Sequence, residues 1–125
     1  MPKRVLLVED EPNIVESLRF LLGRAGFDVE VQANGREGLR AARDTAPDVL
    51  ILDVMLPEIN GLEVLRQLRA EDCGQALPVL MLTAKGQRED RDRAIDAGAD
   101  IFLTKPFANA DLVSAVQSLA DGRPG

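Results

Sequence analysis

The 125-residue sequence contains no histidine, tryptophan or tyrosine, and its only cysteine is Cys73. Without histidine, the chain cannot form a His-ligated zinc site, a Ser/His or Cys/His catalytic pair, or a phosphohistidine of its own. A single cysteine excludes an internal disulfide and fits a reducing compartment, so we expect a cytoplasmic protein. Any chemistry in this chain must therefore use carboxylates, lysines and hydroxyls.

Basic residues and long apolar runs are also scarce. The chain has 15 basic and 21 acidic residues, and its formal net charge is −6. Because nucleic-acid binding needs a basic face that displaces counterions from phosphates, we expect no direct nucleic-acid binding. No apolar run approaches the roughly 20 residues that cross a bilayer, and the run after residue 4 is too short for a signal peptide, so we expect no membrane association. The length suits a single domain.

Short apolar runs of strand length recur along the chain. The first three runs, residues 5–8, 49–52 and 79–82, contain no polar residue. This pattern favours strands that are buried on both faces, as in a parallel sheet covered by helices. A further segment, residues 28–32, alternates between polar and apolar side chains and predicts a half-buried edge strand. The apolar runs are residues 5–8, 49–52, 79–82 and 101–103.

Helical patterns lie between these runs. Pro12 suits the first turn of one helix, and a charged segment from 87 to 97 predicts another helix that ends at Gly98. Asparagines are suited to cap the three remaining helices, and these predicted caps are Asn34, Asn60 and Asn109.

Strand and helix thus alternate five times. This (βα)5 order predicts an α/β fold with right-handed crossovers and a doubly wound, five-stranded parallel sheet of the flavodoxin-like kind. With the alternating segment at the edge beside the first strand, the predicted strand order is 2-1-3-4-5. In such sheets ligands bind beyond the carboxyl ends of the strands, at the switch point between the first and third strands.

Acidic residues stand at that switch point. Glu9, Asp10 and Glu11 follow the first strand, and Asp53 ends the third. An acidic loop is commonly a solvated turn, but an acid at the end of a buried neighbouring strand predicts that Glu9, Asp10 and Asp53 converge. Converging carboxylates repel one another unless a cation holds them. An oxygen-only donor set favours a hard ion, and Mg²⁺ is the usual one where phosphate chemistry takes place.

Two further strand ends complete the predicted crevice. Thr83 closes the fourth strand and Lys105 follows the fifth. Either residue alone is commonplace in a turn, but a hydroxyl and an ammonium together can hold the oxygens of a phosphoryl group on Asp53. The combination therefore indicates phosphoryl chemistry at Asp53.

Four motifs resemble those of the receiver domains of bacterial two-component response regulators. They are VLLVEDEP at 5–12, DVMLP at 53–57 with Gly61, LTAK at 82–85 and GADIFLTKPF at 98–107. They occur in the family's order and spacing, and the resemblance covers residues 3 to about 119. It implies one receiver domain, residues 1–119, followed by a tail or linker start at residues 120–125.

The resemblance also implies roles for particular residues. Asp53 would be the phosphoacceptor, and Mg²⁺ would be held by Asp10, by Asp53, by the backbone carbonyl of Met55 and, mainly through water, by Glu9. Thr83 and Lys105 would bind the phosphoryl oxygens. Thr83 and Phe102 would form the switch, which alters the face made by the fourth helix, fifth strand and fifth helix. The Lys105–Pro106 peptide bond is often cis in this family, and Met55 and Lys85 flank the phosphoryl group and can tune its lifetime.

Partners follow from the same resemblance and from the missing histidine. The phosphoryl group must come from a sensor histidine kinase or a histidine phosphotransfer protein, and an output protein or domain must read the switch. The chain would not be an enzyme with turnover: it would phosphorylate itself stoichiometrically from a phosphodonor and dephosphorylate itself slowly. The alternative is a degenerate receiver that acts as an unphosphorylated protein-binding module.

Two other functions fit the fold less well. A flavin-binding electron carrier needs a hydroxyl- and glycine-rich phosphate loop where this chain has three acids. A phosphatase with an aspartyl nucleophile usually has a second acid two residues later, where this chain has Met55.

The stretches MLP at 55–57 and TAKG at 83–86 resemble those in receivers of winged-helix transcription regulators, which often dimerise through the switching face. Some of the charged residues expected for that dimer are present, namely Arg91, Asp100 and Asp111. Others are replaced by uncharged residues, so we expect a monomer or a weak dimer. The replaced positions are Ile101, Ala115 and Gln117.

Overall fold

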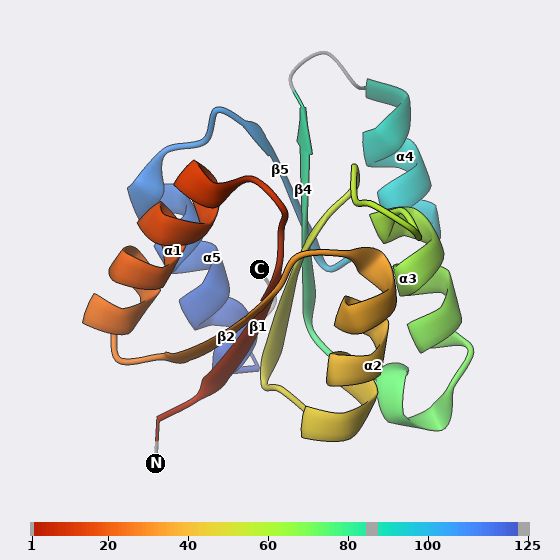
Figure 1. Cartoon of the computed structure of the whole chain (residues 1–125), viewed down its shortest axis with the longest axis horizontal. Coiled ribbons are helices and arrows are strands. Elements are labelled where there is room, and N and C mark those ends of the chain that lie inside the picture. The colour runs from red at the N-terminus through yellow and green to blue at the C-terminus, as the bar shows by residue number, and fades with distance from the viewer. Residues whose placement is uncertain (1, 85–87, 123–125) are drawn as a thin grey trace.

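The computed structural model describes residues 2–84 and 88–122, with the side chains of residues 73 and 88–90 outside the description (Figure 1). Within these residues, five strands alternate with five α-helices, and one short 3-10 helix follows the third α-helix. The elements are β1 (Arg4–Val8), α1 (Pro12–Arg24), β2 (Asp28–Gln32), α2 (Gly35–Thr45), β3 (Val49–Asp53), α3 (Gly61–Arg69), η1 (Asp72–Gly74), β4 (Val79–Ala84), α4 (Arg88–Asp96), β5 (Ile101–Lys105) and α5 (Asn109–Ala120).

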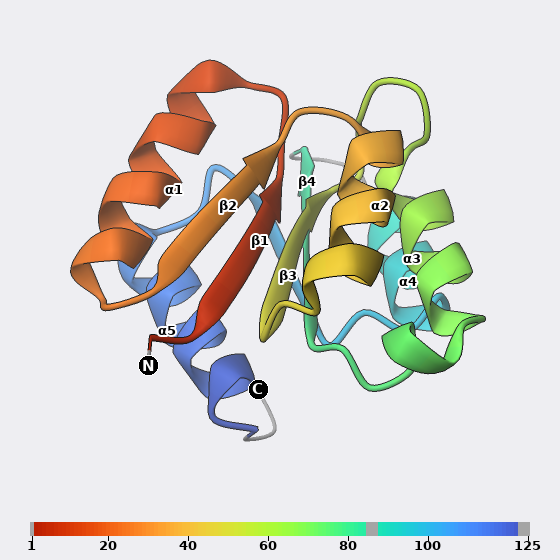
Figure 2. The same ribbon diagram turned by 60° about the horizontal axis from the view of Figure 1, so that its bottom comes forward.

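The strands form one parallel sheet in the order β2-β1-β3-β4-β5, which confirms the predicted flavodoxin-like α/β fold. Helices α1 and α5 cover one face of the sheet, and α2, α3 and α4 cover the other (Figures 1 and 2). The alternating segment is β2, at the edge beside β1 as predicted. Because all five strands run the same way, their carboxyl ends lie along one edge of the sheet.

The middle strand β3 shows why its sequence is a continuous apolar run. Every residue of Val49–Asp53 is buried, because helices pack on both faces of the sheet. Leu50 and Leu52 join the core under α2, α3 and α4, whereas Val49 and Ile51 join the core under α1 and α5. Alternate side chains of one strand thus belong to two separate cores, as expected for a doubly wound sheet.

Two of the three predicted asparagine caps are confirmed. Asn34 Oδ1 accepts a hydrogen bond from the backbone N–H of Glu37 at 2.8 Å, and Asn60 Oδ1 accepts one from the N–H of Glu63 at 3.0 Å. These bonds satisfy amide groups that have no partner within the first turn of their helices.

The third predicted cap, Asn109, is wrong. Ala108 holds the capping position without a side-chain hydrogen bond, and Asn109 is already the first helical residue. The backbone of Ala108 is extended, and its carbonyl accepts hydrogen bonds from the N–H groups of Asp111 and Leu112, so the helix starts one residue early. This helix also runs to Ala120, one residue into the predicted tail, while residues 123–125 lie outside the described residues.

Among the described helices, none is long and apolar enough to cross a membrane.

The capping difference can be tested by two matched substitutions. Asn34→Ala removes a side-chain cap and is expected to lower the free energy of unfolding by about 1 kcal/mol. Asn109→Ala removes no cap bond and should change it by less than about 0.5 kcal/mol, as usual for a surface position. Urea unfolding of the two variants and the unaltered protein measures both values, and equal losses would contradict the assignment.

Candidate functional site

Three carboxylates meet at the carboxyl edge of the sheet, between β1 and β3. Oxygen atoms of Glu9, Asp10 and Asp53 all lie within 4.8 Å of one another. The pairing of Val8 with Leu52 brings the ends of the two strands side by side, and Glu9 and Asp53 each follow within one residue. Glu9 and Asp53 are only 1% and 4% exposed, whereas Asp10 is open to solvent. The predicted convergence of these three side chains is therefore confirmed.

Lys105 reaches into this acidic cluster from the end of β5. Its Nζ donates a hydrogen bond to Glu9 Oε1 at 2.8 Å and lies 3.3 Å from Asp53 Oδ2. Among the described residues, this cluster therefore combines one ammonium with three carboxylates, which leaves an excess of two negative charges when all four groups are ionised. That excess equals the charge of one divalent cation.

Glu9 is held in place through both of its oxygens. Oε1 accepts the bond from Lys105, while Oε2 accepts backbone hydrogen bonds from Asp10 at 3.0 Å and from Glu11 at 3.1 Å. These three contacts fix the orientation of the Glu9 carboxylate. The Asp10 carboxylate, in contrast, is exposed to solvent.

The electrostatics of Asp53 reflect this crowding. The pKa of Asp53 is raised to about 7, mainly by burial and then by the negative charge of Glu9, while Lys105 lowers it without cancelling these two effects. Burial would lower the pKa of Lys105, but its bond to Glu9 and the charges of Asp53 and Glu9 outweigh burial and raise it. The site is therefore unfavourable for a third carboxylate charge in the absence of a cation.

The backbone around Asp53 is closely packed. Val54 N–H donates to the carbonyl of Leu82 on β4 at 2.9 Å, and the N–H of Gly61 donates to the carbonyl of Val54 at 2.8 Å. A Cβ atom on Gly61 would lie 2.0 Å from the carbonyl oxygen of Asp53, so only glycine fits there. Sequence reasoning included Gly61 in a motif but did not predict this contact, which depends on how α3 returns to the end of β3.

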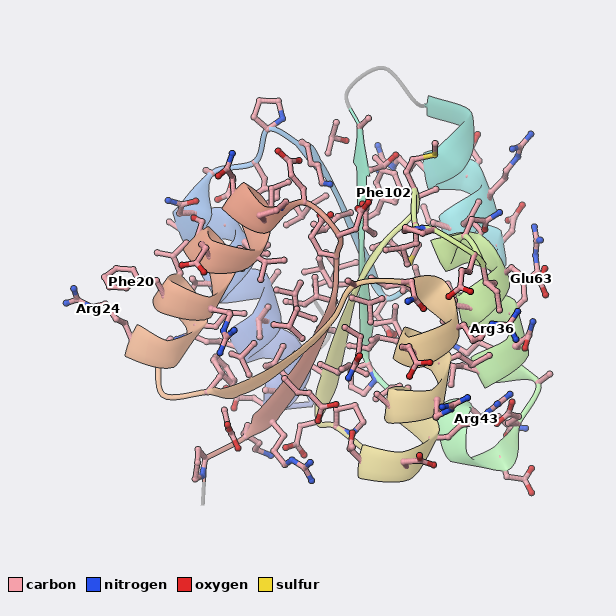
Figure 3. All side chains as sticks on the ribbon, viewed as in Figure 1. Phe20, Arg24, Arg36, Arg43, Glu63 and Phe102 are labelled. Atoms are coloured by element: carbon pink, nitrogen blue, oxygen red, sulfur yellow. The ribbon has the colours of Figure 1, made fainter. Side chains whose placement is uncertain are left out.

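The remaining predicted residues lie around this edge of the sheet. Thr83 is 1% exposed on β4, one residue beyond the pairing of Asp53 with Leu82. Phe102 on β5 is half-buried and packs against the core under α2, α3 and α4 (Figure 3). The side chain of Met55 is 69% exposed.

Two details complete the comparison with the sequence predictions. The Lys105–Pro106 peptide bond is cis, as expected. Lys85, predicted to flank the phosphoryl group, lies outside the described residues.

The fold and this edge of the sheet define a class of protein. A model of the response regulator receiver domain family matches residues 5–117, so the chain belongs to that family, whose members act in two-component systems. Solved structures agree: a putative response regulator from Chloroflexus aurantiacus J-10-fl is 36% identical with a TM-score of 0.92, over 97% of this chain and 99% of that one.

A second solved structure is informative about the site. The receiver domain of the sensor histidine kinase PA1611 from Pseudomonas aeruginosa PAO1 is 30% identical with a TM-score of 0.89, over 97% of this chain and 99% of that one. That protein has a magnesium ion coordinated in its active site cleft.

Curated relatives include longer proteins. The response regulator MprA of Mycolicibacterium vanbaalenii is 44% identical over 119 residues, which are 95% of this chain and 51% of that protein. The alkaline phosphatase synthesis transcriptional regulatory protein PhoP of Bacillus subtilis is 40% identical over 95% of this chain and 49% of its own length. The chain therefore spans about half the length of the curated relatives it matches.

The raised pKa of Asp53 leads to a prediction about stability. Its folded-state pKa of about 7 lies above the ordinary value near 4. As the pH rises between these values, Asp53 ionises in the unfolded chain but keeps its proton in the folded protein, so the folded protein progressively loses stability. Without Mg²⁺, Asp53→Asn should therefore stabilise the protein above pH 7 by about 4 kcal/mol, and by much less near pH 4.

Urea unfolding of both proteins in EDTA, across this pH range, measures the difference. An advantage of Asp53→Asn that stayed constant with pH would contradict the raised pKa. Addition of Mg²⁺ should reduce the advantage at high pH, because a bound cation offsets the carboxylate charge.

Proposed function

We propose that this protein receives a phosphoryl group on Asp53 from the phosphohistidine of a sensor histidine kinase or histidine phosphotransfer protein, with Mg²⁺ bound beside it. One observation carries the proposal: in a member of the receiver family, a buried Asp53 lies within 4.8 Å of two further carboxylates and 3.3 Å from the ammonium of Lys105. A structural ion pair alone would not need the two additional acids.

The residues at this edge of the sheet fit a magnesium ion. The donors are oxygens only, they carry excess negative charge, and one of them is exposed to solvent. In the proposal, Asp10 and Asp53 bind the ion through their carboxylates, Met55 through its backbone carbonyl, and Glu9 through water. When bound, Mg²⁺ offsets negative charge on the transferring phosphoryl group. The magnesium in the related receiver of PA1611 supports this choice.

The protein's own groups would perform the transfer as follows. A carboxylate oxygen of Asp53 forms a bond to phosphorus as the phosphorus–nitrogen bond of the donor breaks in line with it. Lys105, already 3.3 Å from Asp53 Oδ2, pairs with an oxygen of the incoming group. The hydroxyl of Thr83 donates a hydrogen bond to another oxygen. These donors stabilise the charge without moving far.

The phosphorylated state would then alter the surface. An acyl phosphate carries about two negative charges, which draw Thr83 toward it. Phe102, half-buried on the neighbouring strand, can turn into the space that Thr83 leaves, and this changes the face formed by α4, β5 and α5. A two-state side chain coupled to a local charge is what a signalling switch requires.

We also propose a domain organisation and a cellular context for the protein. Residues 1–119 form the receiver and residues 120–125 a tail or linker start. The receiver works in the cytoplasm, passes its signal to an output protein or domain, and itself contacts neither membrane nor nucleic acid. It is not an enzyme with turnover, since each chain carries one phosphoryl group and loses it slowly.

Intact-mass measurement tests the acceptor. After incubation with acetyl phosphate and Mg²⁺, we expect one phosphoryl adduct on the unaltered protein, and none in EDTA or on Asp53→Asn. Lys105→Met should still fold but form the adduct more slowly, because one charge opposite the phosphoryl oxygens is lost.

A missing adduct has two explanations, and beryllofluoride separates them. If beryllofluoride with Mg²⁺ changes the amide NMR spectrum of the protein, the site binds the phosphoryl mimic and acetyl phosphate is a poor donor. If neither reagent acts, the phosphoacceptor proposal fails and the protein is an unphosphorylated binding module.

The oligomeric state is a separate prediction. Asp100, one of the acids retained from the dimerising receivers, is already engaged within the chain. Its Oδ2 accepts hydrogen bonds from the N–H of Val79 at 2.8 Å and from Arg69 at 3.2 Å. Together with the uncharged residues at 101, 115 and 117, this contact favours a monomer or weak dimer even in the activated state.

Light scattering after size exclusion, with Mg²⁺ and beryllofluoride, should therefore give a monomer mass at micromolar concentration. A complete shift to a dimer would show that the retained charges suffice.

A further inference from the structure

The loop that follows Asp53, residues 54–60, packs against the first residue of α2. The N–H of Gly35 donates a hydrogen bond to the carbonyl of Pro57 at 3.1 Å. A Cβ atom on Gly35 would lie 1.8 Å from the carbonyl oxygen of Ile59 and 2.7 Å from its carbonyl carbon. Both views show this loop beside the beginning of α2 (Figures 1 and 2). Only a residue without a side chain allows such close contact.

The same loop is held at its other side by β3 and α3. The N–H groups of Leu56 and Gly61 both donate to the carbonyl of Val54, at 3.2 and 2.8 Å. The loop therefore lies between the end of β3 on one side and Gly35 on the other. Its path is tight enough to place Glu58 in the left-handed region, with a φ of 68°.

An exposed ion pair reinforces this contact only weakly. Arg36 Nε lies 3.8 Å from Glu58 Oε1, and both side chains are about half exposed (Figure 3). Such pairs contribute little in water. The backbone contact of Gly35 is therefore the stronger of the two restraints on the loop from this side.

The first turn of α2 cannot move away from the loop. Asn34 caps the helix, and a Cβ atom on Gly38 would lie 2.6 Å from the Val8 side chain on β1. The helix is thus seated against the last residue of β1, directly before Glu9. A side chain at position 35 would have to displace the loop, because the helix behind it has no room to retreat.

We infer that Gly35 is a positioning residue for the proposed metal and phosphoryl site. It sets the position of the loop that begins after Asp53 and carries the carbonyl of Met55, although it contacts neither the ion nor the phosphoryl group. This inference rests on the proposed function. It also makes a claim that is independent of the metal, namely that Gly35 restrains residues 54–60.

Gly35→Ala is the test variant, and the chain offers matched controls. A Cβ atom on Gly74 would lie 2.1 Å from the carbonyl oxygen of Leu68, so Gly74→Ala creates a similar clash with a backbone carbonyl. Gly74 precedes β4 and therefore lies at the amino edge of the sheet, opposite the site. A Cβ atom on the helical Gly23 meets nothing within 4 Å, so Gly23→Ala should be tolerated and slightly stabilising.

Mg²⁺ titration gives the first readout. We expect Gly35→Ala to weaken Mg²⁺ binding by about tenfold or more, the usual scale for residues that support metal ligands. Gly74→Ala and Gly23→Ala should bind Mg²⁺ within about twofold of the unaltered protein. Normal binding by Gly35→Ala, or an equal loss in Gly74→Ala, would overturn the inference.

Amide hydrogen exchange gives a readout that needs no metal. The N–H groups of Leu56 and Ile59, bonded to the carbonyls of Val54 and Pro57, should exchange faster in Gly35→Ala and unchanged in Gly74→Ala. Unchanged exchange in Gly35→Ala would overturn the inference. If the unaltered protein binds no Mg²⁺ but exchange rises as expected, the proposed function fails and the restraint by Gly35 stands.

To check that the variants still fold, Gly35→Ala and Gly74→Ala are also made in the slightly stabilised Gly23→Ala background. In Gly35→Ala we expect the loop of residues 54–60 to shift while the rest of the protein stays folded. If Gly35→Ala cannot be recovered folded in either background while Gly74→Ala can, Gly35 is a residue of the folded core and the positioning role is wrong.

Discussion

The charge balance around Asp53 is the constraint on which the rest of the structure depends. Three carboxylates are collected at the ends of buried strands, and Lys105 offsets only part of their charge. The pKa of Asp53 of about 7 shows that this arrangement opposes ionisation of the buried acid. A fold that gained only stability from these positions would not place acids there. In the proposed function, this unfavourable charge prepares the site for a divalent cation.

The surrounding fold accommodates this charge by placing the acids at the ends of the strands. Both β1 and β3 pack their apolar side chains into two cores, one on each face of the sheet, and Glu9 and Asp53 follow the last of these apolar strand residues. The acids therefore occupy strand ends, where loops and solvent provide room for an ion. Close backbone contacts at Gly61 then fix the end of β3 without adding a side chain to the crowded edge.

Local patterns and the predicted strand order gave the elements, two of the caps and the convergence of the three acids. They did not give the individual contacts between distant elements. The apolar run of β3 and the caps at Asn34 and Asn60 were predicted, because each depends on a few adjacent residues. The bond between Lys105 and Glu9 was not, since β1 and β5 are three strand spacings apart, about 14 Å. The contact of Gly35 with Ile59 was also missed, because these residues are distant in the sequence. The cap at Asn109 was mispredicted by one residue, because the sequence does not decide whether Ala108 or Asn109 precedes the first helical residue.

The distance between β1 and β5 also bears on how the site could respond to phosphorylation. Lys105 spans the carboxyl edge to bond Glu9, and on the way its ammonium lies 3.3 Å from Asp53. A phosphoryl group on Asp53 would replace one carboxylate charge with about two negative charges in the same place. Lys105 would then be attracted more strongly toward Asp53, and its bond to Glu9 would weaken unless a cation compensates there. In this scheme the cation and Lys105 together offset the negative charge of the phosphorylated site.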